Sequence, residues 1–133
     1  MIFVDTSFWI ALRLRRDGRH DEALRLLDGH RQSPLVTSNH VRGETWTFLR
    51  ARGGHRDGVA FLEMAEATPR LQLAFVSESL EREAVEWLRR HDERPYSFVD
   101  ATSFALMRAL GIREALAFDG DFAAAGFVEL RAV

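Results

Sequence analysis

The sequence predicts an α/β fold with a central parallel sheet of about five strands and helices packed around it. Short apolar runs expected to form buried strands occur near residues 2–5, 34–37, 71–76, 114–118 and 127–130. Helical patterns occur near residues 7–15, 20–31, 39–52, 55–67, 79–91, 98–110 and 120–125. Strands that alternate with helices pair in parallel through right-handed crossovers, which gives the fold class.

The composition fits a single domain over residues 1–133. The chain has 133 residues and is 47% hydrophobic, so it can bury one sizeable core. Cysteine is absent, which excludes disulfides, thiolate zinc sites and iron–sulfur clusters. No run approaches the ~18 apolar residues of a membrane span, and no signal peptide precedes the first predicted strand. We therefore expect a cytoplasmic protein with no membrane partner.

Acidic residues follow two of the predicted strands directly. Asp5 comes at the end of the first apolar run, and Asp119 and Asp121 follow the run from Ala115 to Phe118. In open α/β sheets, ligands bind at the carboxyl ends of the strands. Each acid also has an ordinary structural interpretation, because Asp is a common helix N-cap and Asp-Gly a common turn.

Glu44 lies within a helical pattern, three residues after Val41 and four before Phe48. These spacings put its carboxylate on the apolar face of the expected helix. A buried carboxylate costs on the order of several kcal/mol unless it is paired, hydrogen-bonded or bound to a metal. The alternative is a side chain at the margin of that face, turned to solvent or paired with Arg42 or Arg50.

Asp100 is expected in the first turn of a helix, because Pro95 and Ser97 precede a helical pattern. The helix dipole favours negative charge there, which is its structural explanation. Phe104, one turn later, indicates that Asp100 also faces inward.

Together these segments resemble the PIN-domain ribonucleases, and most closely the VapC-type toxins of bacterial type II toxin–antitoxin systems. The matching motifs are "FVDTSFW", "SNHVRGETWTFLR", "SFVDATSFALM" and "LAFDGDF", in an order and spacing that cover essentially the whole chain. The resemblance implies a small α/β/α sandwich that carries a metal-dependent endoribonuclease site.

The resemblance also implies a role for each acid. Asp5 and Asp100 would be the most direct metal ligands, Glu44 would support or bridge, and Asp119 would complete the cluster. Asp121 matches a more variable position. A hydroxyl next to the first acid, from Thr6 or Ser7, could orient a carboxylate or a water molecule.

The residue types suit this chemistry. Carboxylate oxygens are typical ligands of Mg²⁺, for which Mn²⁺ may substitute. Two such ions about 3.5–4 Å apart stabilise the attacking and leaving oxygens of a phosphodiester displacement. Without metal, the crowded carboxylates repel one another, which raises some of their pKa values and destabilises the site.

The basic residues favour RNA as the substrate although the net charge is −2. All 18 basic residues are arginines, a type that binds phosphates and stacks on bases. Two clusters lie near acidic segments: Arg13, Arg15, Arg16 and Arg19, then Arg42, Arg50, Arg52 and Arg56. The ordinary interpretation is a set of solvated helix faces combined with GC-rich codon usage.

The expected partners are therefore an RNA such as tRNA or rRNA, a cognate antitoxin protein and a second copy of the chain in a homodimer. Trp9, Trp46 and Trp87 lie in apolar helical patterns and are expected in the core or at a subunit interface. A surface-lying apolar stripe on one of these helices would favour the dimer.

Two alternatives remain open. A phosphoryl-transfer domain of the receiver or haloacid-phosphatase kind would also place Asp5 at a strand end, but such enzymes use a lysine near the phosphate and this chain has none. A catalytically silent PIN-like module that binds RNA or protein is the second alternative, and the intact acids count against it.

Overall fold

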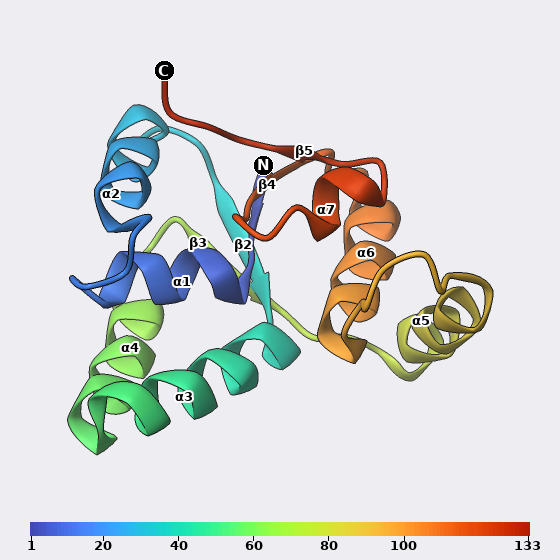
Figure 1. Ribbon diagram of the computed structural model, residues 1–133, viewed down its shortest axis with the longest axis horizontal. Coiled ribbons are helices and arrows are strands. Elements are labelled where there is room, and N and C mark those ends of the chain that lie inside the picture. The colour runs from blue at the N-terminus through green and yellow to red at the C-terminus, as the bar shows by residue number, and fades with distance from the viewer.

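A five-stranded parallel sheet runs through the middle of the protein, whose computed structural model describes residues 1–133 (Figure 1). The strands are β1 (Ile2–Val4), β2 (Leu35–Ser38), β3 (Leu71–Ala74), β4 (Glu114–Leu116) and β5 (Val128–Glu129). The helices are α1 (Thr6–Arg13), α2 (His20–Gly29), α3 (Asn39–Gly53), α4 (His55–Ala67), α5 (Glu78–Arg90), α6 (Phe98–Leu110) and α7 (Asp121–Ala124). The predicted α/β fold with five parallel strands is confirmed, and α1 and β3 end slightly earlier than expected.

The strand order β3-β2-β1-β4-β5 places β1 at the centre of the sheet. Phe3 of β1 is paired with Val36 on one side and Ala115 on the other. The chain first builds outward from β1 through β2 to β3, then returns to the other side of β1 with β4. This reversal makes the carboxyl ends of β1 and β4 the topological switch point, where ligands bind in such sheets.

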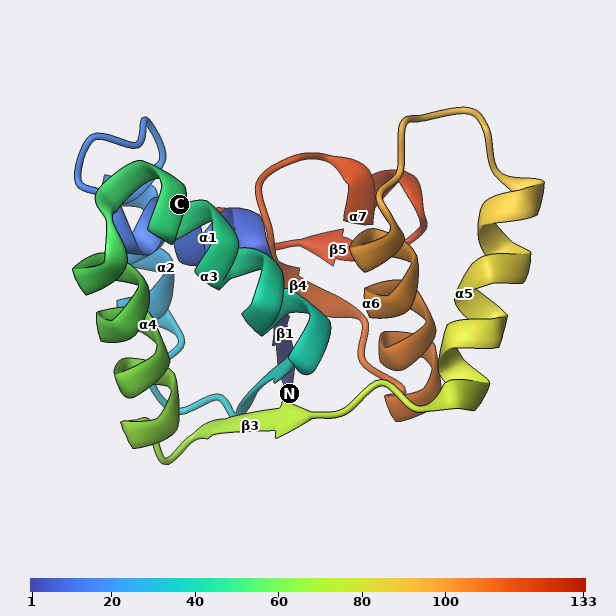
Figure 2. The ribbon, with the colours of Figure 1, turned by 90° about the horizontal axis from the view of Figure 1, so that it is seen from below.

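Helices cover both faces of the sheet. Figures 1 and 2 show α1, α2 and α4 on one side and α5, α6 and α7 on the other. The core between these layers is strongly aromatic: Phe3, Phe8, Phe61, Phe104 and Phe122 are all fully buried. No helix combines the length and the apolar character that a bilayer crossing would require.

The helix pair α3–α4 forms an arm with a tight turn between the helices. Gly54 joins the two helices with φ of +87°, a conformation that favours glycine. The pair is then held by close packing, because a Cβ added at Gly58 would come within 2.7 Å of the Trp46 ring. The arm carries Glu44, so its packing positions one of the predicted site residues.

The other two tryptophans, Trp9 and Trp87, are both buried in the core. Trp9 packs edge-on against Phe61, and Trp87 packs in the same way against Phe104. These contacts agree with the prediction of core anchors for both residues.

Candidate metal centre

The structure brings all five sequence-predicted acids to one cavity of about 280 Å³ beside the carboxyl ends of β1 and β4. Its lining consists of Asp5, Thr6, Ser7, Ile10, Glu44, Phe48, Pro95, Ser97, Asp100, Asp119 and Asp121. Only two of these residues are hydrophobic. We call this cavity the acidic cavity.

Asp5 is fixed by the end of β1 and the start of α1. Its backbone N–H donates to the carbonyl of Leu116 at 3.0 Å, which ties it to β4. Its carboxylate Oδ2 accepts from the Ser7 hydroxyl at 2.7 Å and from the Ser7 backbone N–H at 3.1 Å. Asp5 therefore caps α1 and lines the cavity at once, so its role as an N-cap does not prevent it from facing a ligand.

Ser7 is the hydroxyl that orients this carboxylate. Its Oγ also accepts from the backbone N–H of Phe118 at 3.0 Å. The same side chain thus connects the acid after β1 to the segment after β4. This link spans 111 residues of sequence, so no local pattern indicates it.

Three carboxylates form a tighter group within the cavity. Asp100, Asp119 and Asp121 each offer an oxygen, and these atoms all lie within 4.8 Å of one another. Asp100 is the third residue of α6 and completes a capping box with Ser97, whose backbone N–H donates to Asp100 Oδ2 at 2.9 Å. Asp121, which matches a more variable position of the motif, is therefore one of the three acids whose oxygens converge.

Glu44 reaches the cavity from α3 and is half-buried. Neither Arg42 nor Arg50 forms an ion pair with it, so the predicted alternative of a paired surface residue is not what the structure has. Phe48, one helical turn later, lines the same cavity.

Burial and mutual repulsion raise the pKa values of three of these acids, Asp5, Asp100 and Asp119. Desolvation, with the charge of Asp119 next, raises the pKa of Asp5 to about 8 despite the opposing Ser7 hydrogen bonds. Desolvation also raises the pKa of Asp100 to about 6, with Asp119 and Asp121 adding to it. The pKa of Asp119 is raised mainly by desolvation as well, although the residue as a whole is exposed. These three carboxyls therefore ionise less readily than free ones as long as no cation is bound.

The donor set fits a hard divalent cation. Every ligand that the cavity offers is an oxygen, which suits Mg²⁺ or Mn²⁺. Thr6 adds a hydroxyl that is buried and has no hydrogen-bond partner within the protein, a group that a metal's water shell would satisfy. His40 is stacked on Phe98 and faces Glu81, outside the cavity lining.

Sequence reasoning missed one charged residue at this site. Arg94 donates from Nε to Asp121 Oδ1 at 2.8 Å and from Nη2 to the carbonyl of Asp119 at 3.3 Å. Its loop lies between α5 and α6, where no periodicity indicates which way a side chain points. The only available signal was its position shortly before Pro95 and Ser97, which start the Asp100 segment.

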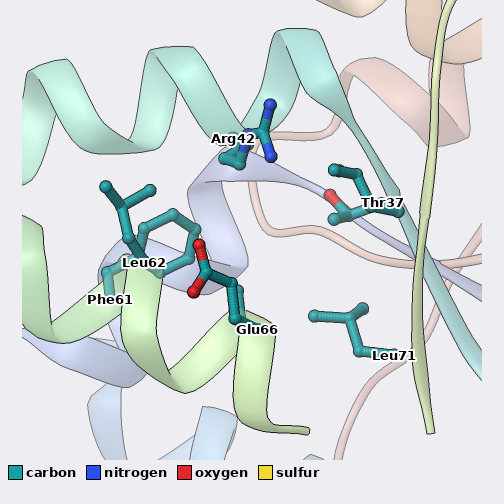
Figure 3. Close-up of a pocket in the computed structure, with 8 residues that line it drawn as sticks. Thr37, Arg42, Phe61, Leu62, Glu66 and Leu71 are labelled. Atoms are coloured by element: carbon teal, nitrogen blue, oxygen red, sulfur yellow. The ribbon is translucent and has the colours of Figure 1, made fainter. Parts of the chain in front are cut away.

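A second cavity, between α4 and β3, differs from the acidic cavity in chemistry. Figure 3 shows Phe61, Leu62 and Leu71 around it, with Arg42 and Glu66 as its charged residues. One carboxylate beside an arginine does not form a multivalent cation site. The acidic cavity is therefore the better candidate for a metal centre.

Comparisons with known proteins agree with this geometry. The PIN domain family model matches residues 2–128. Two curated proteins from strains of Mycobacterium tuberculosis, CDC 1551 / Oshkosh and H37Rv, are each 57% identical to the chain over 131 residues. That alignment covers 98% of this chain and 98% of each relative, and both relatives are named 23S rRNA-specific endonuclease VapC20.

The same relative appears among the solved structures. A crystal structure of M. tuberculosis VapC20, described as a toxin that cleaves the sarcin–ricin loop, superposes with a TM-score of 0.94 at 55% identity. The match covers 99% of this chain and all of the other. The chain therefore belongs to the PIN-domain family and, as its motifs predicted, to the VapC-type toxins within it.

Proposed function

We propose that this protein is a metal-dependent endoribonuclease whose substrate is the sarcin–ricin loop of 23S rRNA. The observation that carries the proposal is the acidic cavity, where Asp100, Asp119 and Asp121 converge within 4.8 Å and Asp5 and Glu44 line the same space. Because the relatives that are 57% identical are named for 23S rRNA, we favour rRNA over tRNA. An rRNA substrate also supports our proposal that the activity is cytoplasmic.

The residues of the cavity would have different roles. Asp5, Asp100, Asp119 and Asp121 would hold Mg²⁺, or Mn²⁺ in its place, and Glu44 would complete the set from α3. A bound cation supplies Lewis-acid stabilisation of phosphate charge and activates water for attack. Ser7 keeps the Asp5 carboxylate in one orientation, and the capping box does the same for Asp100. Preorganised ligands of this kind need little rearrangement when substrate arrives.

Family membership supports proposals about two protein partners. We propose a cognate antitoxin that neutralises the nuclease, as expected of a VapC-type toxin. We also propose a homodimer, for which the exposed aromatic ring of Phe98 offers a surface beside the start of α3. Light scattering of the purified protein measures this directly, and Phe98→Ala should shift the dimer toward monomer.

Replacement of Asp100 by Asn tests the activity. The amide oxygen can still accept from the Ser97 N–H and so preserve the capping box, while the charge that holds the metal is lost. Because even residues that only support metal ligands are worth about 10- to 100-fold, we expect cleavage to fall at least about 100-fold. The assay is cutting of a sarcin–ricin loop hairpin by EDTA-stripped protein resupplied with Mg²⁺ or Mn²⁺.

Asp28→Asn is the matched control, because Asp28 lies on α2 in an exposed ion pair with Arg31. It should cut like the unmodified protein. Full cleavage by Asp100→Asn, or cleavage that persists in EDTA, would contradict the proposal. A protein that binds the hairpin but never cuts it would instead support the catalytically silent alternative.

A further inference from the structure

The acidic cavity continues into a neighbouring cavity of about 250 Å³. The two share Ser7, Ile10, Phe48 and Asp119, so they lie side by side. The remaining lining of this neighbouring cavity is Asp17, Arg19, Arg52 and Phe118. We call it the flanking cavity.

The flanking cavity combines exposed aromatic surface with positive charge. The Phe48 side chain is 41% exposed although Phe is usually buried, and the Arg52 guanidinium lies 5.3 Å from the centre of its ring. The Arg19 guanidinium covers Phe118 in the same way at 5.2 Å. Each arginine therefore extends along an aromatic face instead of into bulk solvent.

Arg52 also lacks a carboxylate partner. Six other arginines form ion pairs: Arg19, Arg31, Arg82, Arg89, Arg94 and Arg131. None of those pairs involves Arg52, and its side chain makes no hydrogen bond. Its charge is thus free to attract an anion at the border of a strongly acidic site.

RNA binding at this site needs such a charge. The five carboxylates of the acidic cavity repel the phosphates on either side of the scissile one, and a bound cation offsets this only locally. Proteins that bind single-stranded nucleic acid combine a basic groove with aromatic rings on which bases stack. The flanking cavity has the exposed Phe48 ring and the unpaired Arg52, although Asp17 and Asp119 also line it.

We propose that the flanking cavity binds the nucleotide adjacent to the scissile phosphate, with its base stacked on Phe48 and its phosphate held by Arg52. This proposal rests on the endoribonuclease function proposed above and assigns a substrate subsite to it. Arg19 lies at the same cavity with half of its side chain exposed, although its pairing with Glu22 leaves it less free than Arg52. An unstacked loop nucleotide suits this arrangement, because only a base outside a helix can present its face to a ring.

The chain offers a matched control. Arg42 and Phe75 form a second pair of the same kind, with the guanidinium 5.8 Å from the ring centre, the ring 66% exposed and Arg42 half-buried. Neither residue lines the acidic or the flanking cavity. Loss of an exposed Phe or of an arginine charge can thus be compared inside and outside the proposed subsite.

The experiment measures binding of a sarcin–ricin loop hairpin to Asp100→Asn protein, which should not cut it, with Mn²⁺ present. Base–aromatic stacking is worth enough that Phe48→Ala should weaken binding about 5- to 100-fold, and Phe48→Trp should restore it. Arg52→Gln should weaken binding and reduce the slope of log K against log salt by roughly one ion. Phe75→Ala and Arg42→Gln should bind within about twofold of the parent. Each substitution, made instead in protein that retains Asp100, should leave Mn²⁺ affinity unchanged.

A second measurement uses the otherwise unmodified enzyme. There Phe48→Ala should raise KM far more than it lowers kcat, because the metal ligands stay in place. Binding by Phe48→Ala and Arg52→Gln equal to that of the Phe75 and Arg42 variants would overturn the subsite while leaving the nuclease proposal intact. The subsite would also be overturned if Phe48→Ala abolished antitoxin binding but not RNA binding. A parent protein that neither bound nor cut the hairpin would overturn both proposals.

Discussion

At the scale of single residues, burial and neighbouring negative charges act together on the pKa of Asp5. It is 2% exposed, and the charges of Asp119 and Asp100 add to the effect of burial on its pKa. Two hydrogen bonds from Ser7 favour the charged form but do not compensate, so the pKa is raised from 3.8 to about 8. The metal-free protein therefore holds a proton here at neutral pH, and a cation must displace it.

This shift predicts how the metal-free protein responds to pH. The folded state binds the Asp5 proton more tightly than the unfolded chain does, so the group contributes stability that is complete below about pH 4. That stability is lost as pH rises through the folded pKa of about 8, and Asp100 adds a similar loss up to about pH 6. Urea unfolding in EDTA should therefore give a free energy that falls from pH 5 to pH 8.

Asp5→Asn separates this effect from the rest of the titration. The amide oxygen can still accept from the Ser7 hydroxyl, but it has no proton to lose, so the decline with pH should be clearly shallower. Asp28→Asn should follow the unmodified protein, because Asp28 is exposed on α2. Parallel curves for Asp5→Asn and the unmodified protein would show that Asp5 does not carry the shift.

Arg94 provides a second prediction at this scale. Its guanidinium already pairs with Asp121, one of the three converging acids, and this pairing raises the pKa of Arg94 further. A cation at the same carboxylate is repelled by this charge, so Arg94→Met should strengthen Mn²⁺ binding. The pair is exposed and solvent screens it, so we expect a gain of less than about fivefold.

Calorimetric titration of EDTA-stripped protein measures the change in affinity. Arg89→Met is the control, because Arg89 forms a comparable exposed pair with Glu86 on α5. It should leave Mn²⁺ affinity unchanged. Weaker binding by Arg94→Met would mean that the arginine serves to hold Asp121 in position and does not compete with the metal.

At the scale of elements, the α3–α4 arm carries Glu44 and Phe48 and depends on one close contact. A Cβ at Gly58 would lie 2.7 Å from the Trp46 ring, so one of the two helices would have to shift. Such overpacking typically costs about 1–3 kcal/mol, and we expect Gly58→Ala to lower the free energy of unfolding by that amount. Chemical denaturation measures it.

Gly43→Ala is the matched control on the same arm. Gly43 lies within α3, and nothing lies within 4 Å of an added Cβ. Because alanine is the better helix former, this change should raise the free energy of unfolding by about 0.5–1 kcal/mol. Equal effects of the two substitutions would show that the contact with Trp46 adapts without cost.

The elements were the most predictable part of this protein, and specific residues show why. Asp5 and Asp119 could be placed together from the sequence because parallel strands end at the same edge of a sheet, wherever the strands lie in the order. The adjacency of β1 and β4 was not predictable, since alternation of strands and helices allows several orders. The pairing of Arg94 with Asp121 depends on that order and on a loop without periodicity, so it needed the structure.

At the scale of the whole molecule, the small net charge hides a local concentration of acids. The net charge is only −2, but five carboxylates share the acidic cavity, and no arginine is part of its lining. The mutual repulsion of the acids lowers the free energy of unfolding, and the packing of the aromatic core opposes this effect. A cation that binds only the folded protein would offset this repulsion and so raise the free energy of unfolding.

The metal should therefore stabilise the fold, and more strongly at high pH. A ligand at 100 times its Kd adds about 2.7 kcal/mol to the free energy of unfolding if it binds only the folded state. At pH 6 the cation must first displace the Asp5 proton, whereas at pH 8 about half of that carboxyl is already ionised, so the same Mn²⁺ concentration should raise Tm more at pH 8. Asp100→Asn should lose most of the increase, because it removes a ligand from the tight group.

Ionic strength is the decisive control for this last prediction. Added salt also screens the repulsion among the carboxylates, and screening alone would raise Tm without any bound ion. Thermal unfolding should therefore be compared in Mn²⁺ and in NaCl of equal ionic strength, at both pH values. A bound ion predicts a saturating increase with Mn²⁺ that NaCl does not reproduce and that Asp28→Asn retains. Equal increases from both salts would mean that the acids gain from screening alone, and the cavity would then not be a metal site in the free protein.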